Sequence, residues 1–117
     1  APYISEISEK MCFLLEDNGF EIGAAATFGE GRDSIVGCIH PQSILDAIDA
    51  IISSATIPLD AIFISCTSLK CALIIAIAEA QYGIPVISSN SAIAWDMARL
   101  ARLAMPANEK GLLFQQD

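Results

Sequence analysis

The sequence has 117 residues, 54% of them hydrophobic and 17% charged, with a formal net charge of −8. This length suits one domain with enough apolar material for one core. Nucleic acid and anionic membranes are excluded as partners, because both require a basic patch and the chain has only six Lys and Arg residues. No apolar run reaches the roughly 18 to 20 residues of a membrane span. No signal peptide is recognisable either, so we expect a cytoplasmic protein.

Hydrophobic periodicity predicts two helices and a strand in the first half of the chain. Apolar residues at three- and four-residue steps predict a helix over residues 4–15, ended by an Asn-Gly pair. The short apolar segment at residues 20–27 predicts a buried strand, and residues 29–33 predict a mobile loop. From Pro41, a favoured first-turn residue, a clean apolar stripe predicts a helix over residues 41–52.

The second half of the chain repeats strand and helix. The continuous apolar run at residues 61–65 predicts a parallel strand covered on both faces. Residues 69–82 predict a helix that is apolar on nearly every side and therefore buried all around. Residues 84–88 predict a strand, and residues 92–103 predict a last helix. Three residues of this last helix are expected to face inward: Ile93, Met97 and Leu100.

The alternation of these elements predicts an α/β fold. We expect a small doubly wound parallel sheet, flavodoxin-like, in three α/β/α layers. Ligands of such sheets bind beyond the carboxyl ends of the strands, where helices begin. Two of these junctions carry small polar side chains, Ser-Cys-Thr-Ser at residues 65–68 and Ser-Ser-Asn-Ser at residues 88–91. Unpaired N–H groups at the helix starts make each junction a predicted anion site.

Cys66 is the residue of these junctions whose side chain is best suited to act as a base or nucleophile. At the positive end of a helix dipole its thiolate would be favoured, and the thiolate is the form that acts as base or nucleophile. A cysteine that ends a buried strand can equally be a small apolar filler, and hydroxyl residues at helix starts are usually N-caps. From the residues alone, both interpretations stay open.

The other cysteines and the single histidine are predicted to take no part in the chemistry of the site. The sequence has no C-x-x-C spacing and no Cys/His cluster, so we expect neither zinc nor a disulfide framework. Cys12 and Cys38 are expected to be packing residues, and Cys71 does not share a helical face with Cys66. We expect His40 to be an exposed loop residue.

Three separated segments carry a family resemblance. They are Ala-Pro-Tyr at residues 1–3, the stretch at residues 60–70 that contains Ser-Cys-Thr-Ser-Leu-Lys, and the stretch at residues 83–95 that contains Pro-Val-Ile-Ser-Ser-Asn-Ser-Ala-Ile-Ala-Trp. In order and spacing they resemble the C-terminal half of the aspartate/glutamate racemase superfamily. The most similar branch holds maleate cis-trans isomerase, arylmalonate decarboxylase and the ectoine-utilisation protein.

The resemblance implies a cofactor-independent racemase, isomerase or decarboxylase of small dicarboxylic acids, with no metal. It implies that Cys66 is the catalytic cysteine, either as a nucleophile on a double bond or as a proton donor to an enediolate. It further implies five residues that contact substrate carboxylates, where preorganised donors stabilise developing negative charge. These are Tyr3, Thr67, Ser68, Ser89 and Asn90.

The chain also departs from its relatives. They consist of two pseudo-symmetric lobes with the site between them, and residues 1–117 resemble only the second lobe, so we expect the chain alone to be inactive. Ser91 replaces the usual Gln, Lys70 replaces the usual Arg, and Ser34 falls where some relatives have Asn. The substrate therefore cannot be copied from a relative.

A missing N-terminal lobe would explain the apolar helix at residues 69–82 and the mean hydropathy of +0.53. A second copy of the chain bound through the same helix, or tight packing within one domain, would explain them too. A truncated, inactive carboxylate-binding or dimerisation module is therefore the alternative function. A flavodoxin-like or response-regulator domain is weaker, because residues 24–27 offer neither a flavin-cradling loop nor an acidic cluster.

Overall fold

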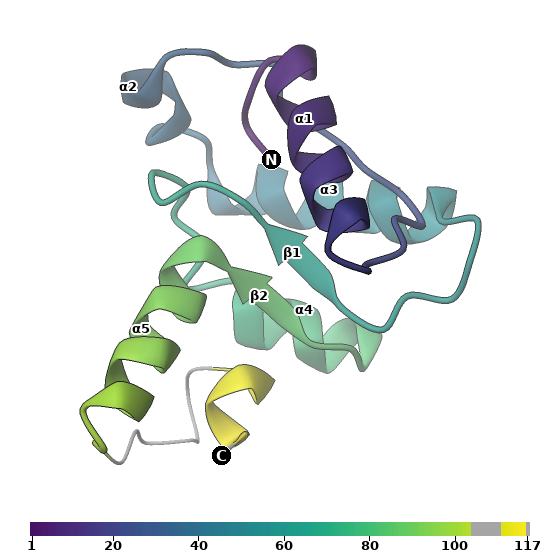
Figure 1. Cartoon of the computed structure of the whole chain (residues 1–117). Helices are drawn as coiled ribbons and strands as arrows, with labels where there is room; N and C mark the ends of the chain where they lie inside the picture. Colours follow the sequence, from purple (N-terminus) through teal and green to yellow (C-terminus); the bar gives the residue numbers. More distant parts are fainter. Residues whose placement is uncertain (104–110, 117) are drawn as a thin grey trace.

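The computed structural model describes residues 1–103 and 111–116 and shows an α/β chain (Figure 1). Two short strands, β1 (Ile62–Ile64) and β2 (Val86–Ser88), form a parallel sheet in which Ile64 is paired with Ser88. The chain between them contains α4, as a parallel crossover requires. The helices are α1 (Ser5–Asp17), α2 (Asp33–Val36), α3 (Pro41–Ser54), α4 (Ile75–Tyr82), α5 (Ser89–Leu100) and the 3₁₀ helix η2 (Leu112–Gln115).

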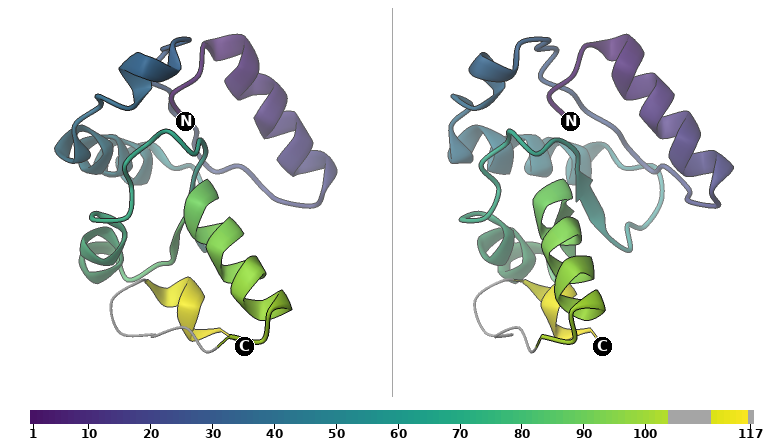
Figure 2. Two further views of the ribbon diagram at one scale, coloured as in Figure 1. Left: turned by 90° about the vertical axis from the view of Figure 1, so that its left-hand side faces the viewer. Right: turned by 60° about the vertical axis from the view of Figure 1, so that its left-hand side comes forward.

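The helices lie on two sides of the strands. In Figure 1, α3 and α4 lie behind the strands, and α1 and α5 lie in front of them; the turned views of Figure 2 show the same separation. No helix in the described part of the chain is long and apolar enough to cross a bilayer.

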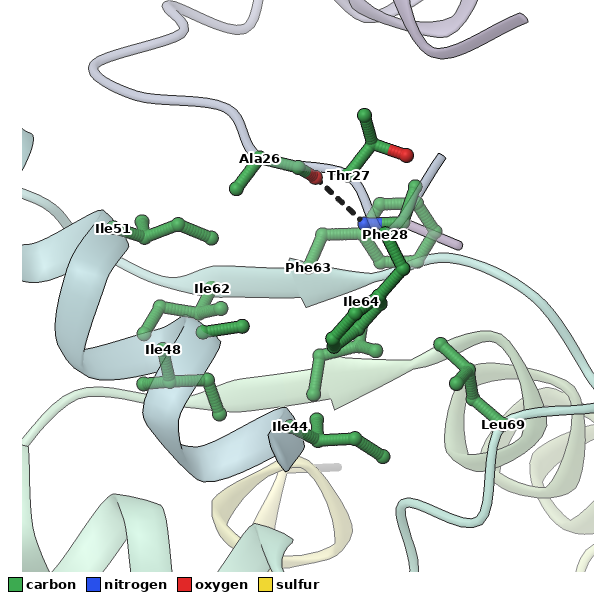
Figure 3. A pocket seen from close by; sticks show the side chains of 12 residues that line it. Ala26, Thr27, Phe28, Ile44, Ile48, Ile51, Ile62, Phe63, Ile64 and Leu69 are labelled. Atoms are coloured by element: carbon green, nitrogen blue, oxygen red, sulfur yellow. Dashed lines mark hydrogen bonds between the residues drawn. The ribbon is translucent and has the colours of Figure 1, made fainter. Parts of the chain in front are cut away.

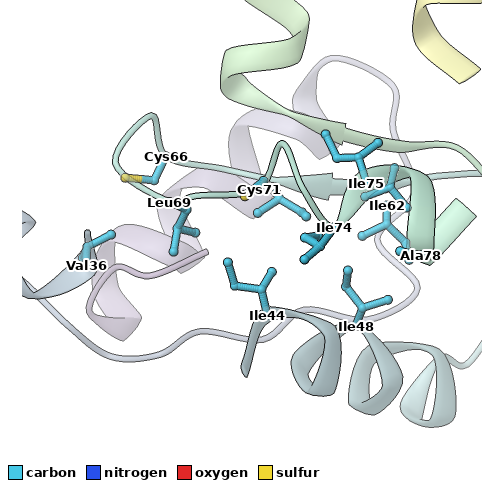
Figure 4. Close-up of a cluster of buried hydrophobic side chains, with 12 residues drawn as sticks. Val36, Ile44, Ile48, Ile62, Cys66, Leu69, Cys71, Ile74, Ile75 and Ala78 are labelled. Atoms are coloured by element: carbon cyan, nitrogen blue, oxygen red, sulfur yellow. The ribbon is translucent and has the colours of Figure 1, made fainter. Parts of the chain in front are cut away.

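The core lies between the strands, α3 and α4. Ile44 and Ile48 of α3 point toward Ile62 and Ala78 (Figure 4). The predicted helix at residues 41–52 is confirmed, and its residues form it for a clear local reason. Pro41 occupies the first turn, and Nδ1 of the exposed His40 accepts a hydrogen bond of 3.1 Å from the N–H of Gln42.

The predicted helix at residues 69–82 begins later than expected, at Ile75. Residues 67–74 form turns instead, and Leu69 and Cys71 are both buried in the core. Positions two apart do not share a helix face, so only a turn lets both side chains face the core. The helix is also not buried all around, because Leu73 beside it is 79% exposed and Ile77 is 53% exposed. The predicted stop at Gly83 is confirmed, with φ +71°.

The predicted strand at residues 20–27 is wrong, since this segment has no strand ladder. Its backbone makes isolated hydrogen bonds, such as the one from the N–H of Thr56 to the carbonyl of Gly23. Ala and Gly, which dominate the segment, are poor strand residues. The loop predicted at residues 29–33 leads directly into the short helix α2, which buries Val36.

Helices α1 and α5 are confirmed, but the apolar stripes that the periodicity identified are largely exposed within the described residues. α1 buries no residue within the described chain. α5 starts at Ser89, before the predicted residue 92, and buries Ser91 and Ala98. The three residues predicted to face inward are all exposed: Ile93, Met97 and Leu100. The sequence pattern identified an apolar stripe correctly, but the stripe has no partner among the described residues.

Candidate active site at the carboxyl ends of the strands

The two junctions singled out in the sequence lie against each other. Parallel pairing brings the carboxyl ends of β1 and β2 to the same edge of the sheet. The backbone N–H of Cys66 donates a hydrogen bond of 3.1 Å to Oγ of Ser89, and Nδ2 of Asn90 donates one of 2.9 Å to the carbonyl of Thr67. The expected neighbourhood of the Cys66 turn and the first turn of α5 is therefore present.

Tyr3 reaches the same place from the other end of the chain. Its phenol oxygen lies 3.3 Å from Oγ of Ser65, the residue that precedes the Cys66 turn. The backbone of Tyr3 is fixed by its neighbours, since Pro2 is fully buried and the hydroxyl of Thr27 donates to the carbonyl of Tyr3. Residues 62 positions apart thus converge at the carboxyl end of β1.

Cys66 has an unusual backbone conformation. Its φ is +105°, a region that costs a residue with a side chain about 1–3 kcal/mol. The residue is only 7% exposed, and it lies at the edge of the buried cluster, with its side chain turned away from Ile44 and Ile48 (Figure 4). The N–H of Ser68 donates to Sγ of Cys66 across 3.4 Å.

The source of positive potential near Cys66 differs from the predicted one. The dipole of α4 acts over roughly its first turn, and α4 begins well after Cys66, at Ile75. The local donors are instead backbone N–H groups of the turn itself. Besides the N–H of Ser68, the N–H groups of Thr67 and Lys70 make no hydrogen bond to another group within residues 1–103 and 111–116. A turn with several free donors is suited to an anion.

The four residues of the second junction, Ser88 to Ser91, divide into two pairs with different roles. Ser88 and Ser91 are buried and cap α5 reciprocally: the N–H of Ser91 donates to Oγ of Ser88 across 3.1 Å, and the N–H of Ser88 donates to Oγ of Ser91 across 2.9 Å. Ser89 and Asn90 face the Cys66 turn. The capping box thus fixes the helix turn from which these two side chains project.

Sequence reasoning missed Glu79, a buried carboxylate in α4. Its Oε1 accepts from the N–H of Val86 at 2.9 Å, and its Oε2 accepts from the N–H of Leu112 at 2.8 Å. Glu79 therefore ties α4 to the start of β2 and to η2. A lone acidic residue in an otherwise apolar helix was the available signal, because a buried carboxylate needs donors.

The pKa values of Cys71 and Glu30 are shifted by their surroundings. Burial raises the pKa of the Cys71 thiol to about 11, and nearby Cys66 adds to the effect, so Cys71 stays protonated at neutral pH. Arg32 is engaged by Glu30 across 2.9 Å. Hydrogen bonds from Arg32 lower the pKa of Glu30 to about 2. The structure leaves Arg32 paired within its own loop.

One apolar cavity in the described part of the chain is separate from these residues. It measures about 50 Å³ and lies between α3, β1 and residues 26–28, with almost entirely apolar walls (Figure 3). None of the six site residues predicted from the sequence lines it. Within the described ranges, no group of three or more His, Cys, Asp or Glu side chains could hold a metal ion.

A comparison with known families places the chain. A sequence model of the arylmalonate decarboxylase family matches residues 1–114, and the chain belongs to that family. It is 31% identical over 117 residues to the maleate isomerase of Nocardia farcinica, covering 99% of this chain and 45% of that protein. The resemblance drawn from the three segments is confirmed.

Solved structures give the same result. A cysteine-to-serine variant of the N. farcinica maleate cis-trans isomerase, with a covalently bound succinylcysteine intermediate, superposes with a TM-score of 0.87 at 30% identity, covering 99% of this chain and 46% of that one. The maleate isomerase of Pseudomonas putida S16 gives 0.83 at 27%, covering 97% and 45%. A glycine-to-cysteine variant of arylmalonate decarboxylase with an associated sulfate ion gives 0.78 at 25%, covering 98% and 49%. The chain spans about half the length of these relatives.

Proposed function

We propose that this chain is one lobe of a cofactor-independent isomerase, racemase or decarboxylase of small dicarboxylic acids, with Cys66 as its catalytic cysteine. The observation that carries the proposal is the Cys66 turn itself. A strained cysteine, flanked by backbone N–H groups without acceptors, lies at the carboxyl end of β1 against the first turn of α5. Strained residues concentrate at functional sites, and this position in a parallel sheet is where ligands bind.

The relatives indicate the chemistry. The N. farcinica enzyme carries a succinyl group on a cysteine although another of its cysteines is replaced by serine. In the corresponding reaction a thiolate adds to one carbon of a cis double bond. The π electrons move to the other carbon, where the adjacent carboxylate stabilises them as an enediolate. Rotation about the new single bond and expulsion of the thiolate then give the trans isomer. In the decarboxylase variant of the proposal, loss of CO₂ leaves the enediolate and Cys66 protonates it.

The remaining residues would bind the carboxylates. Thr67 and Ser68 carry hydroxyl groups beside the free backbone donors of the turn. The hydroxyl proton of Ser89 is not used by its contact with Cys66, because Oγ of Ser89 accepts there. Asn90 retains a second amide proton, and Tyr3 presents its phenol group. Donors already in place cost no reorganisation when negative charge develops on the substrate.

The proposal also includes a partner. The chain spans about half the length of its relatives and exposes large apolar side chains on α1, α4 and α5. We expect a second lobe, or a second copy bound through residues 69–82, to cover part of this surface and complete the site. The doubly wound, flavodoxin-like three-layer fold belongs to the same proposal, and the placement of helices on both sides of the sheet supports it.

Two measurements test the proposed function. Titration with maleate, followed by NMR, is expected to shift the amide signals of Thr67, Leu69 and Lys70 and to leave those of α3 unchanged. Signal shifts spread over the whole chain, or no shifts at all, would contradict the carboxylate site. The chain alone is expected not to isomerise maleate or decarboxylate an arylmalonate, and robust turnover by a monomer would contradict the half-site.

The second candidate function is a folded, inactive module that binds carboxylates weakly or associates with another chain. The exposed Leu73 and Ile77 favour it, because a permanently solitary domain rarely exposes such residues side by side on one segment. The native mass of the assembly separates the cases. A dimer that shows turnover supports the enzyme, whereas a dimer without turnover, even with Cys66 intact and reactive, supports the module.

A further inference from the structure

We infer that Ser89 and Asn90 are positioning residues, which hold the Cys66–Thr67 turn in its strained conformation. This role is additional to any contact with substrate. Each side chain forms a hydrogen bond with the backbone of the turn at a different point. Ser89 accepts the N–H of Cys66 at 3.1 Å, and Asn90 donates to the carbonyl of Thr67 at 2.9 Å. The two contacts bracket the Cys66–Thr67 peptide from one neighbouring element.

The turn needs such support because its backbone is unfavourable by itself. A cysteine at φ +105° persists only where surrounding contacts over-determine it. The element that supplies the contacts is rigid, since Ser88 and Ser91 cap the first turn of α5 in both directions. The strain in one loop is thereby balanced by hydrogen bonds from an independently stabilised helix.

The conformation has a consequence for the sulfur atom. Within the turn, the N–H of Ser68 lies 3.4 Å from Sγ of Cys66 and donates to it. This contact fixes the position of the sulfur atom relative to the backbone of the turn. If the turn relaxed, this donor would separate from Sγ. Ser89 and Asn90 would therefore influence the reactivity of Cys66 through the backbone, without contacting the sulfur. This consequence for reactivity rests on the proposed function, in which Cys66 is the catalytic cysteine.

The test compares the full chain with Ser89→Ala, Ser89→Thr and Asn90→Ala, and uses Ser53→Ala, an exposed serine of α3, as the matched control. Amide hydrogen exchange at Cys66 reports the backbone contact. The rate of alkylation of Cys66 by iodoacetamide near neutral pH, with the exposed Cys38 as internal reference, reports the accessibility and reactivity of the sulfur. Both readouts are taken at Cys66, and amide exchange in the buried part of α3 shows whether a variant has lost stability generally, because global opening speeds exchange throughout the chain.

We expect Ser89→Ala to speed amide exchange at Cys66 and to slow alkylation of Cys66 near neutral pH about fivefold, the size expected from losing one hydrogen bond. Ser89→Thr, which keeps the acceptor oxygen, should restore both readouts, and Ser53→Ala should change neither. Unchanged amide exchange and an unchanged alkylation rate in Ser89→Ala, or a lack of rescue by Ser89→Thr, would overturn the inference. If Ser89→Ala does not fold, Asn90→Ala decides by the same criteria.

The same data separate this inference from the proposed function. Wild-type Cys66 that is alkylated no faster than Cys38 would contradict the catalytic role, and amide exchange would still decide whether Ser89 holds the turn. Fast alkylation in the wild type that persists unchanged in Ser89→Ala would contradict only the positioning role.

Discussion

Replacing Cys66 by glycine and by alanine measures the strain in the turn. Both substitutions remove the sulfur, so their difference reports only the β-carbon. At an ordinary φ, glycine is less stable than alanine by about 0.5–1 kcal/mol. At φ +105°, alanine retains a strain of about 1–3 kcal/mol that glycine lacks. We therefore expect Cys66→Gly to be more stable than Cys66→Ala by about 1 kcal/mol, near the centre of the difference between these two effects.

Cys71 provides the matched control for this comparison. It is also buried and follows the same strand, but its φ is not positive. There, Cys71→Gly should be less stable than Cys71→Ala by about 0.5–1 kcal/mol. Urea unfolding followed by circular dichroism gives the four free energies of unfolding by linear extrapolation. If glycine is worse than alanine at Cys66, as at Cys71, the turn is not strained and the structural reason for assigning function to Cys66 disappears.

The remaining predictions concern the groups that support the site. Glu79→Ala leaves the N–H groups of Val86 and Leu112 without their acceptors, so the free energy of unfolding should fall by about 2–5 kcal/mol in urea titrations, whereas the exposed Glu9→Ala should change it by less than about 0.5 kcal/mol. A loss as small as that of Glu9→Ala would show that the Glu79 contacts do not hold the fold together. The raised pKa of Cys71, about 11 against 9.0, means that the unfolded chain loses this proton at lower pH than the folded chain. Stability should therefore fall between pH 9 and 11, and Cys71→Ala should flatten this part of the pH profile; an equally steep decline in the variant would contradict the assignment.

The sequence predicted the elements whose signals are local. The apolar stripe after Pro41 defines α3 because its spacing matches a helix and its start is well capped. The strands β1 and β2 were also predicted correctly from local apolar runs. The segment at residues 20–27 could not be resolved in this way, since an apolar run does not reveal whether a neighbouring strand is available to pair with it.

The candidate site was predictable in its position and not in its geometry. Parallel strands bring their carboxyl ends together, so the approach of Ser89 to Cys66 followed from topology alone. The positive φ of Cys66 has no sequence signal, because such positions normally hold glycine. The inward face of α5 was predicted wrongly because periodicity identifies an apolar stripe and not the surface that covers it. For Met97, that surface is absent from the described chain.

Substrate protection of Cys66 tests the central claim most directly. Cysteine alkylation is mapped by mass spectrometry near neutral pH, with and without maleate, and Cys38 and Cys12 serve as references in the same molecule. The account predicts that Cys66 is alkylated faster than both references and that maleate slows the alkylation of Cys66 alone. A Cys66 that reacts no faster than Cys38 or Cys12, or whose reaction is indifferent to maleate, would contradict the account.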